Sequence, residues 1–209
     1  MARIGWATVA IAVLTAAPAR AQAPSGNDFT IGAPNFVIAR YASVSASSLY
    51  AGYSLGAAGV LVAMVNNPRS GYHDLVVGAM SRIARGQQGA SFAVAIADAS
   101  DATYLQVYLV PNVLVGRLSL SSTIEWYDPV ARGGSRELDL NPVTARVQVN
   151  RWLGVGVAYA LALPAGAEAH ERIGPTVRVA IPRGALYTEF LRNVSNSAAE
   201  VRVGMDLAF

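Results

Sequence analysis

The sequence predicts an all-β fold, a transmembrane antiparallel up-and-down β-barrel of about 12 strands, with 10 strands as the alternative. The chain is 53% hydrophobic and only 14% charged. Many short segments alternate between apolar and polar residues, a period of two that is typical of strands. Beyond the N-terminal region, no segment has the roughly 18 uninterrupted apolar residues of a membrane helix. A barrel reconciles these observations because its strands need an apolar residue only at every second position.

The N-terminal region predicts export. Arg3 precedes an apolar stretch over 4–17, and small residues follow up to Ala23, the layout of a secretory signal peptide. The stretch is shorter than the roughly 20 residues of a spanning helix, so a retained anchor is the weaker alternative. We therefore expect residues 1–23 to be a signal peptide, 24–34 a lead-in segment, and 35–209 one barrel domain.

Composition excludes two common classes. The chain has no cysteine, so a disulfide scaffold is ruled out. All 16 basic residues are arginines, and removal of Arg3 and Arg20 with the signal peptide leaves them nearly balanced by the 13 acids. Because no arginine-rich run exists, we expect no nucleic acid partner.

The C-terminal segment 201–209 alternates without a break, with Val, Val, Met, Leu and Phe on one face. Its Gly204, Leu207 and Phe209 resemble the final strand of bacterial outer-membrane β-barrel proteins, although Val203 stands where that family often has a polar residue. The resemblance implies an assembly signal at these three residues. It also implies location in the cell outer membrane, with periplasmic chaperones and the barrel-assembly machinery as partners during biogenesis.

Further strands are expected upstream of this segment. They cover 185–193, 173–181, 152–163, 137–149, 113–127, 103–110, 91–98 and 74–84. The joins between them alternate between short and long along the chain, beginning with Pro111-Asn112 (short) and 128–136 (long). This alternation is typical of barrels with short periplasmic turns and longer external loops. The region 35–65 divides into three shorter pieces, which favours 12 strands over 10, with 24–34 a periplasmic lead-in. At Asn141-Pro142 the apolar phase slips, which predicts a β-bulge.

Strand parity assigns charged residues to the lumen, since an outward arginine at the bilayer midplane would cost about 2–4 kcal/mol. The predicted pore-lining residues are Arg40, Arg82, Arg117, Glu125, Arg146, Arg178, Arg202 and Asp206, with Glu137 and Asp139 also inward. Arginine rings favour anions, so the leading hypothesis is a narrow pore or transport channel for small polar or anionic solutes. The alternative is a closed structural barrel, filled by arginine–acid pairs, whose external loops bind lipopolysaccharide or a partner protein.

The remaining chemistry is sparse. His73 and His170 lie in predicted external joins, and a loop-centred hydrolase built on them is the weakest hypothesis, so we expect no catalytic residue, metal or cofactor. In or beside such loops, Arg132, Arg136 and Arg172 are candidates for binding lipopolysaccharide phosphates, against the alternative of solvated loop charges. A homo-oligomer is left open. A soluble β-sandwich or lipocalin-like cup remains a further alternative, because alternation alone does not say which face is wet.

Overall fold

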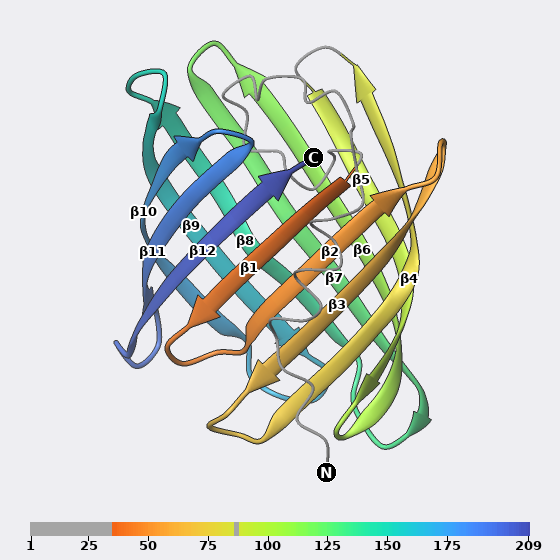
Figure 1. Cartoon of the computed structure of the whole chain (residues 1–209). Helices are drawn as coiled ribbons and strands as arrows, with labels where there is room; N and C mark the ends of the chain where they lie inside the picture. The colour runs from red at the N-terminus through yellow and green to blue at the C-terminus, as the bar shows by residue number, and fades with distance from the viewer. Residues whose placement is uncertain (1–34, 86–87) are drawn as a thin grey trace.

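The computed structural model describes residues 35–85 and 88–209, which form a closed antiparallel β-barrel (Figure 1). Its 12 strands are β1 (Asn35–Ala42), β2 (Ser47–Ser54), β3 (Ala58–Asn67), β4 (Tyr72–Arg85), β5 (Gln88–Ala99), β6 (Ala102–Val115), β7 (Leu118–Arg132), β8 (Glu137–Gln148), β9 (Leu153–Pro164), β10 (His170–Ile181), β11 (Gly184–Asn193) and β12 (Ala199–Ala208). This confirms the prediction of 12 strands. The predicted signal peptide and lead-in lie outside the described residues.

The barrel closes between its first and last strands. β1 pairs with β12 from Phe36 opposite Ala208 to Ala42 opposite Arg202, and every other strand pairs with its neighbours in the chain. Closure leaves no open sheet edge, which is the condition for β-structure inside a bilayer. No helix in the described parts of the chain is long and apolar enough to cross a membrane.

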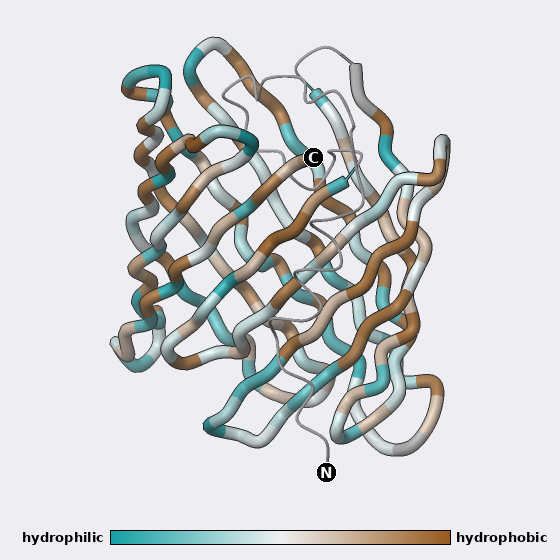
Figure 2. The backbone as a smooth tube through the Cα atoms, in the orientation of Figure 1, coloured by the Kyte–Doolittle hydropathy of each residue, from teal (hydrophilic) through white to brown (hydrophobic). Residues whose placement is uncertain are grey.

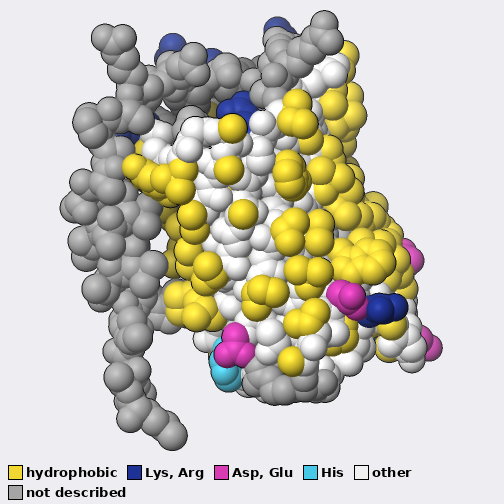
Figure 3. Space-filling model, turned by 90° about the vertical axis from the view of Figure 1, so that its right-hand side faces the viewer, with side chains coloured by type: hydrophobic (Ala, Val, Ile, Leu, Met, Phe, Trp, Pro, Cys, Tyr) yellow, Lys and Arg dark blue, Asp and Glu magenta, His cyan; other side chains and the backbone are white. Residues whose placement is uncertain are grey.

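The outer surface of the barrel is apolar. On β5, Phe92, Val94 and Ile96 are exposed while Ala95 and Ala97 are buried inside. The same alternation runs around the ring. Hydrophobic and hydrophilic residues alternate along the strands in Figure 2, and hydrophobic side chains are spread over the face of the wall seen in Figure 3. An exposed apolar surface of this extent requires lipid rather than water. A soluble cup would carry its polar residues outside, so the prediction of a transmembrane barrel holds.

The predicted β-bulge is present in β8. The register of β8 shifts by one residue between Leu140 and Val143 against β9, and it shifts at the same place against β7. Leu140 and Val143 therefore both face outward despite their opposite parity. A second irregularity, between Thr103 and Tyr104 in the pairing of β6 with β7, was not predicted.

One predicted join is wrong. Pro111-Asn112 does not connect two strands but lies within β6, where Pro111 pairs with Ala90 of β5. The turn comes later, at residues 116–117, where Gly116 has a φ of 60° that favours glycine. Proline removes one ladder donor without ending the strand, so reading it as a turn misplaced this boundary.

The connections divide into two rims. We call the end with Asn35 and Phe209 the terminal rim; its described connections are 55–57, 116–117, 149–152 and 182–183. The opposite end is the loop rim, formed by 43–46, 68–71, 100–101, 133–136, 165–169 and 194–198. All of these connections are short, so the expected contrast between short turns and long loops is much weaker than the sequence suggested.

Candidate functional site: the barrel lumen

The lumen contains two chambers. The terminal chamber, near the terminal rim, has a volume of about 370 Å³ and is lined by residues including Arg82, Arg178 and Asp206. The loop chamber, near the loop rim, has a volume of about 780 Å³ and is lined by residues including Tyr72 and Arg202. Together they extend from one rim of the barrel to the other.

Four residues line both chambers, and we call them the central layer: Arg40, Tyr50, Glu125 and Asn141. They come from β1, β2, β7 and β8, and in the ring β1 and β2 lie opposite β7 and β8. The central layer therefore spans the lumen from both sides. It marks the junction between the chambers and is the candidate constriction.

Neighbouring side chains hold the central layer in place. The Tyr50 ring packs edge-on against Tyr108 with centroids 6.3 Å apart, and the Tyr127 hydroxyl donates a hydrogen bond to Glu125. The β8 bulge places Asn141 inward, where its Oδ1 accepts a hydrogen bond from Arg202 Nη1 at 2.6 Å. These contacts restrict the side chains of the layer from both halves of the ring.

Arg40 differs from the other members of the layer. Its Nε is buried and has no hydrogen-bond partner among the described residues. No described carboxylate forms an ion pair with Arg40, although Glu125 lies across the lumen in the same layer. A guanidinium that lacks a close carboxylate favours water or another polar group beside it. Arg40 is therefore the cation of the central layer that no carboxylate holds within ion-pair distance, although Glu125 and Glu189 lie close enough to interact with it electrostatically.

A ladder of ion pairs covers the wall formed by β8 and β10–β12, which we call the charged wall. Near the loop rim, Arg202 Nε lies 2.8 Å from Glu200 Oε1 and its Nη1 lies 3.8 Å from Glu189 Oε2. The second oxygen of Glu200 lies 3.2 Å from Arg172 Nε. Arg202, Glu200 and Glu189 are each about 1% exposed, so this network is enclosed within the wall.

The ladder continues toward the terminal rim. Arg146 Nη2 lies 3.7 Å from Glu189 Oε1, and its Nε and Nη2 donate to Thr176 Oγ1 at 3.2 Å. Arg178 Nη2 then lies 3.4 Å from Asp206 Oδ2. The charges of this wall are thus largely neutralised by one another.

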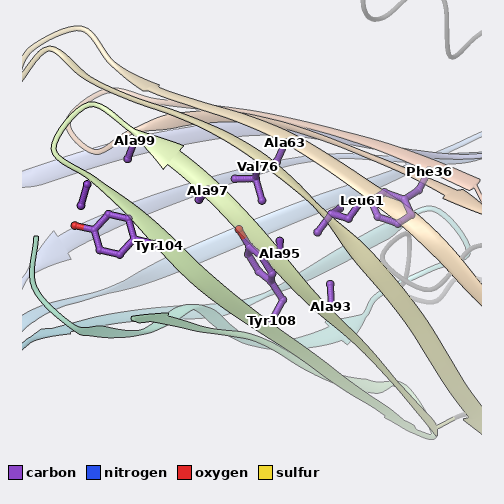
Figure 4. Packing of buried hydrophobic residues seen from close by; sticks show 11 residues of the cluster. Phe36, Leu61, Ala63, Val76, Ala93, Ala95, Ala97, Ala99, Tyr104 and Tyr108 are labelled. Atoms are coloured by element: carbon purple, nitrogen blue, oxygen red, sulfur yellow. The ribbon is translucent and has the colours of Figure 1, made fainter. Parts of the chain in front are cut away.

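The opposite wall is apolar. Small and aromatic side chains of β3–β6, with Phe36 of β1, form one buried cluster along the inside of the barrel, which we call the apolar wall (Figure 4). Its alanines at 93, 95, 97 and 99 take up little space. Polar groups enter it at Gln106, which donates to Asp74 Oδ2 at 3.0 Å and accepts from Tyr108. Of these four alanines, Ala93 lines the terminal chamber, and the other three are packed inside the wall.

Most predicted pore-lining residues lie where parity placed them. Six line the terminal chamber: Arg40, Arg82, Glu125, Arg146, Arg178 and Asp206. Arg202 lines the loop chamber together with Glu137 and Asp139. Arg117 is the exception, because it lies in the 116–117 turn with an exposed side chain rather than in a strand facing the lumen. Their contribution to conduction stays a prediction.

Sequence reasoning missed two acids of the charged wall. Glu200 is buried between Arg172 and Arg202, and Glu189 lies between Arg146 and Arg202 on the inner face of β11. The signal for Glu200 was its spacing of two from Arg202, which places both on one face of β12. Parity also places Glu189 on the inner face of β11, but Leu191 lies on the same face, so apolar and polar residues do not alternate cleanly along this strand.

The three arginines proposed for lipopolysaccharide phosphates do not form a common site. Arg172 lies beside the 165–169 connection, but its side chain points into the lumen and contacts Glu200. Arg136 remains exposed at the loop rim, where its Nε lies 2.6 Å from Asp128 Oδ1. Arg132 ends β7, and its side chain is outside the part that the structure describes.

The residues of the predicted assembly signal lie on β12 and at its end. Leu207 pairs with Val37 and Gly184, and Phe209 N donates to Asn35 O at 2.9 Å. Gly204 faces the lumen beneath the Tyr187 ring, which occupies the space that a Cβ at Gly204 would need. Glycine at this position therefore has a packing reason independent of assembly, and the assembly role stays a prediction.

The two histidines are far apart in the ring. His73 lies at the start of β4 and His170 at the start of β10, on opposite sides of the barrel, and both are exposed. They cannot act as one acid–base pair. In the described residues, no group of three or more His, Asp or Glu side chains is arranged to hold a metal ion.

Comparison with solved structures identifies the class of the fold. The KdgM porin in complex with disordered oligogalacturonate aligns with a TM-score of 0.58 and 12% identity over 84% of this chain and 98% of that one. The NanC porin aligns with a TM-score of 0.57 and 13% identity over 84% of this chain and 100% of that one. The outer membrane protein Omp33 of Acinetobacter baumannii follows with a TM-score of 0.52, 11% identity, and coverages of 85% and 98%.

At these identities the likeness concerns the fold. With the apolar exterior and the closed ring, it establishes this chain as an outer-membrane β-barrel with the porin-like architecture of these small proteins. No family model matches the sequence, and no curated protein matches it.

Proposed function

We propose that the barrel is a narrow outer-membrane pore for small polar solutes, with a weak preference for anions. The observation that carries the proposal is the pair of chambers that meet at the central layer of Arg40, Tyr50, Glu125 and Asn141. A barrel of about eight strands is filled by its own side chains, whereas twelve strands enclose a wider interior. A route lined by charged groups on one side and by apolar and aromatic side chains on the other suits small hydrated solutes.

Charge balance makes the anion preference weak. The charged-wall arginines are paired with carboxylates, so they add little net field to the lumen. Arg40 and Arg82 have no ion pair among the described residues, and both line the terminal chamber. The loop chamber has the opposite balance, with carboxylates at 74, 101, 125, 137 and 139 against arginines at 40, 172 and 202. We therefore place anion selection at the central layer and the terminal chamber.

The test is conductance of the purified chain in planar bilayers under a salt gradient. We expect discrete channel openings and a reversal potential shifted slightly toward the anion. Arg40→Gln should move the reversal potential toward the cation, because it removes the unpaired charge at the constriction. Arg192→Gln is the matched control, since Arg192 is exposed on the outer face of β11 and should leave the potential unchanged.

The outcomes separate the hypotheses. A folded barrel that carries no ion current would remove the pore and favour the closed structural barrel. Openings with a cation-selective reversal potential would keep the pore and remove the anion preference. An unchanged potential in Arg40→Gln would remove Arg40 as the selecting residue.

A further inference from the structure

The two rims of the barrel carry opposite charge patterns. Arg117, Arg151 and Arg183 lie in the terminal-rim connections 116–117, 149–152 and 182–183, and all three are exposed; we call them the arginine collar. Among the side-chain carboxylates of the described strands, the one nearest that end is Asp206, which faces the lumen and pairs with Arg178. In Figure 3, basic side chains without acidic neighbours appear at the upper, terminal rim, while toward the lower rim acidic side chains appear, with a basic side chain beside one of them.

The collar arginines have no counter-charge within the described residues. None of the three forms a hydrogen bond or ion pair with its side chain there, whereas Arg136 at the loop rim binds Asp128 at 2.6 Å. The three connections follow one another around the ring between β6 and β11. The collar is thus an arc of positive charge along half of one rim, and no described side chain forms an ion pair with it.

The collar also lies at the edge of the apolar exterior. Arg117 stands between Val115, which is 63% exposed, and Leu118, and Arg151 precedes Trp152, which is 49% exposed. Tryptophan beside arginine at the end of a membrane strand is typical of the headgroup layer, where amphipathic rings prefer to lie. The Trp152 carbonyl accepts a hydrogen bond from Ala180 N at 2.7 Å, so this connection is tied to β10.

We infer that the arginine collar binds the phosphates of anionic phospholipid headgroups, of the phosphatidylglycerol kind, in the leaflet that meets the terminal rim. Guanidinium groups bind phosphate in a bidentate geometry, and their position beside exposed apolar side chains matches lipid, whose phosphate and acyl chain arrive together. Each basic residue near an anionic membrane surface strengthens its attraction to that surface by about fivefold. Binding there stabilises one orientation of the barrel relative to the membrane surface and does not depend on the pore.

Trp152 makes the binding measurable. The full chain with Trp6→Phe and Trp126→Phe keeps Trp152 as its single tryptophan, since the sequence has three. This protein is folded into phosphatidylcholine vesicles with a minority of phosphatidylglycerol. Two samples are compared: in one, phosphatidylglycerol carries the brominated acyl chains that quench tryptophan fluorescence, and in the other, phosphatidylcholine carries them. We expect phosphatidylglycerol to quench Trp152 several-fold more, per lipid present, than phosphatidylcholine.

Variants and controls decide the origin of the enrichment. In the same background, Arg117→Gln, Arg151→Gln and Arg183→Gln together should bring the quenching ratio to about one, while gel mobility before and after heating reports that the barrel is folded. Arg69→Gln with Arg192→Gln removes two exposed arginines from the loop-rim half and should leave the ratio unchanged. Inorganic phosphate should compete no better than chloride at equal ionic strength, because the collar takes its phosphates from lipid.

Three results would overturn the inference. The first is equal quenching by both lipids in the unaltered collar. The second is an enrichment that survives the triple substitution in a folded barrel. The third is displacement by inorganic phosphate well beyond the chloride effect, which would indicate a soluble-anion site instead.

Discussion

The charged wall and the apolar wall face each other across one lumen, yet they fill its inner surface with different kinds of side chain. Both present apolar side chains to lipid, so the two walls do not differ on the outside. Inside, β8 and β10–β12 carry paired arginines and acids, whereas β3–β6 carry alanines and tyrosines. The bilayer therefore constrains one residue in two, and the other residue is free to hold charge, fill space or leave it open.

The largest effect is expected from breaking the charged wall. Arg202→Met leaves Glu200 and Glu189 buried without their shared cation, and we expect a loss of about 3–5 kcal/mol in the free energy of unfolding. Urea titration of the barrel in lipid vesicles measures it. Adding Glu200→Gln and Glu189→Gln to the same chain should recover only part of the loss, because it removes the two buried carboxylate charges but also takes an ion-pair partner from Arg172 and from Arg146. A loss below about 1 kcal/mol in Arg202→Met would mean that water already solvates this network.

A smaller effect is expected from overfilling the apolar wall. Ala97 is fully buried inside β5, so Ala97→Leu forces its neighbours apart at a cost of about 1–3 kcal/mol. Val94→Leu on the same strand is the control, because Val94 faces lipid and is 44% exposed. The same urea titration compares the two. Equal, small effects would show that the apolar wall has spare room and is less closely packed than described.

The smallest effect is expected at the exposed pair on the loop rim. Arg136→Gln breaks the contact with Asp128, but Arg136 is 68% exposed, so solvent screens the pair and the loss should stay below about 1 kcal/mol. A loss as large as that of Arg202→Met would contradict the distinction between enclosed and surface charges. Unfolding in low and in high salt checks it, because screening should remove what little effect there is.

Much of the fold could be predicted because the membrane imposes a period of two on every strand. The alternation of β9, the bulge at Asn141-Pro142 and the strand count all followed from where apolar residues fall. The predicted end of β6 came too early because of Pro111. A proline lacks a backbone hydrogen-bond donor in a turn and in a strand alike, so the sequence does not distinguish a turn from a strand here.

The site was less predictable than the fold. Parity placed Arg146, Arg178 and Arg202 inward, but it could not show which acid each one meets. Those partners depend on the tilt and stagger of strands around a closed ring, which bring residues of β8 close to residues of β11 and β12. The unpaired state of Arg40 and the junction between the chambers are likewise properties of the closed ring.

The most direct test of a lumen open to small solutes is osmotic swelling of liposomes that contain the purified chain. The account predicts rapid swelling in the smallest sugars and a steep decline as the sugar grows, because solutes must pass the central layer between the two chambers. Swelling no faster than in protein-free liposomes, by a barrel shown to be folded through its heat-dependent gel mobility, would contradict it.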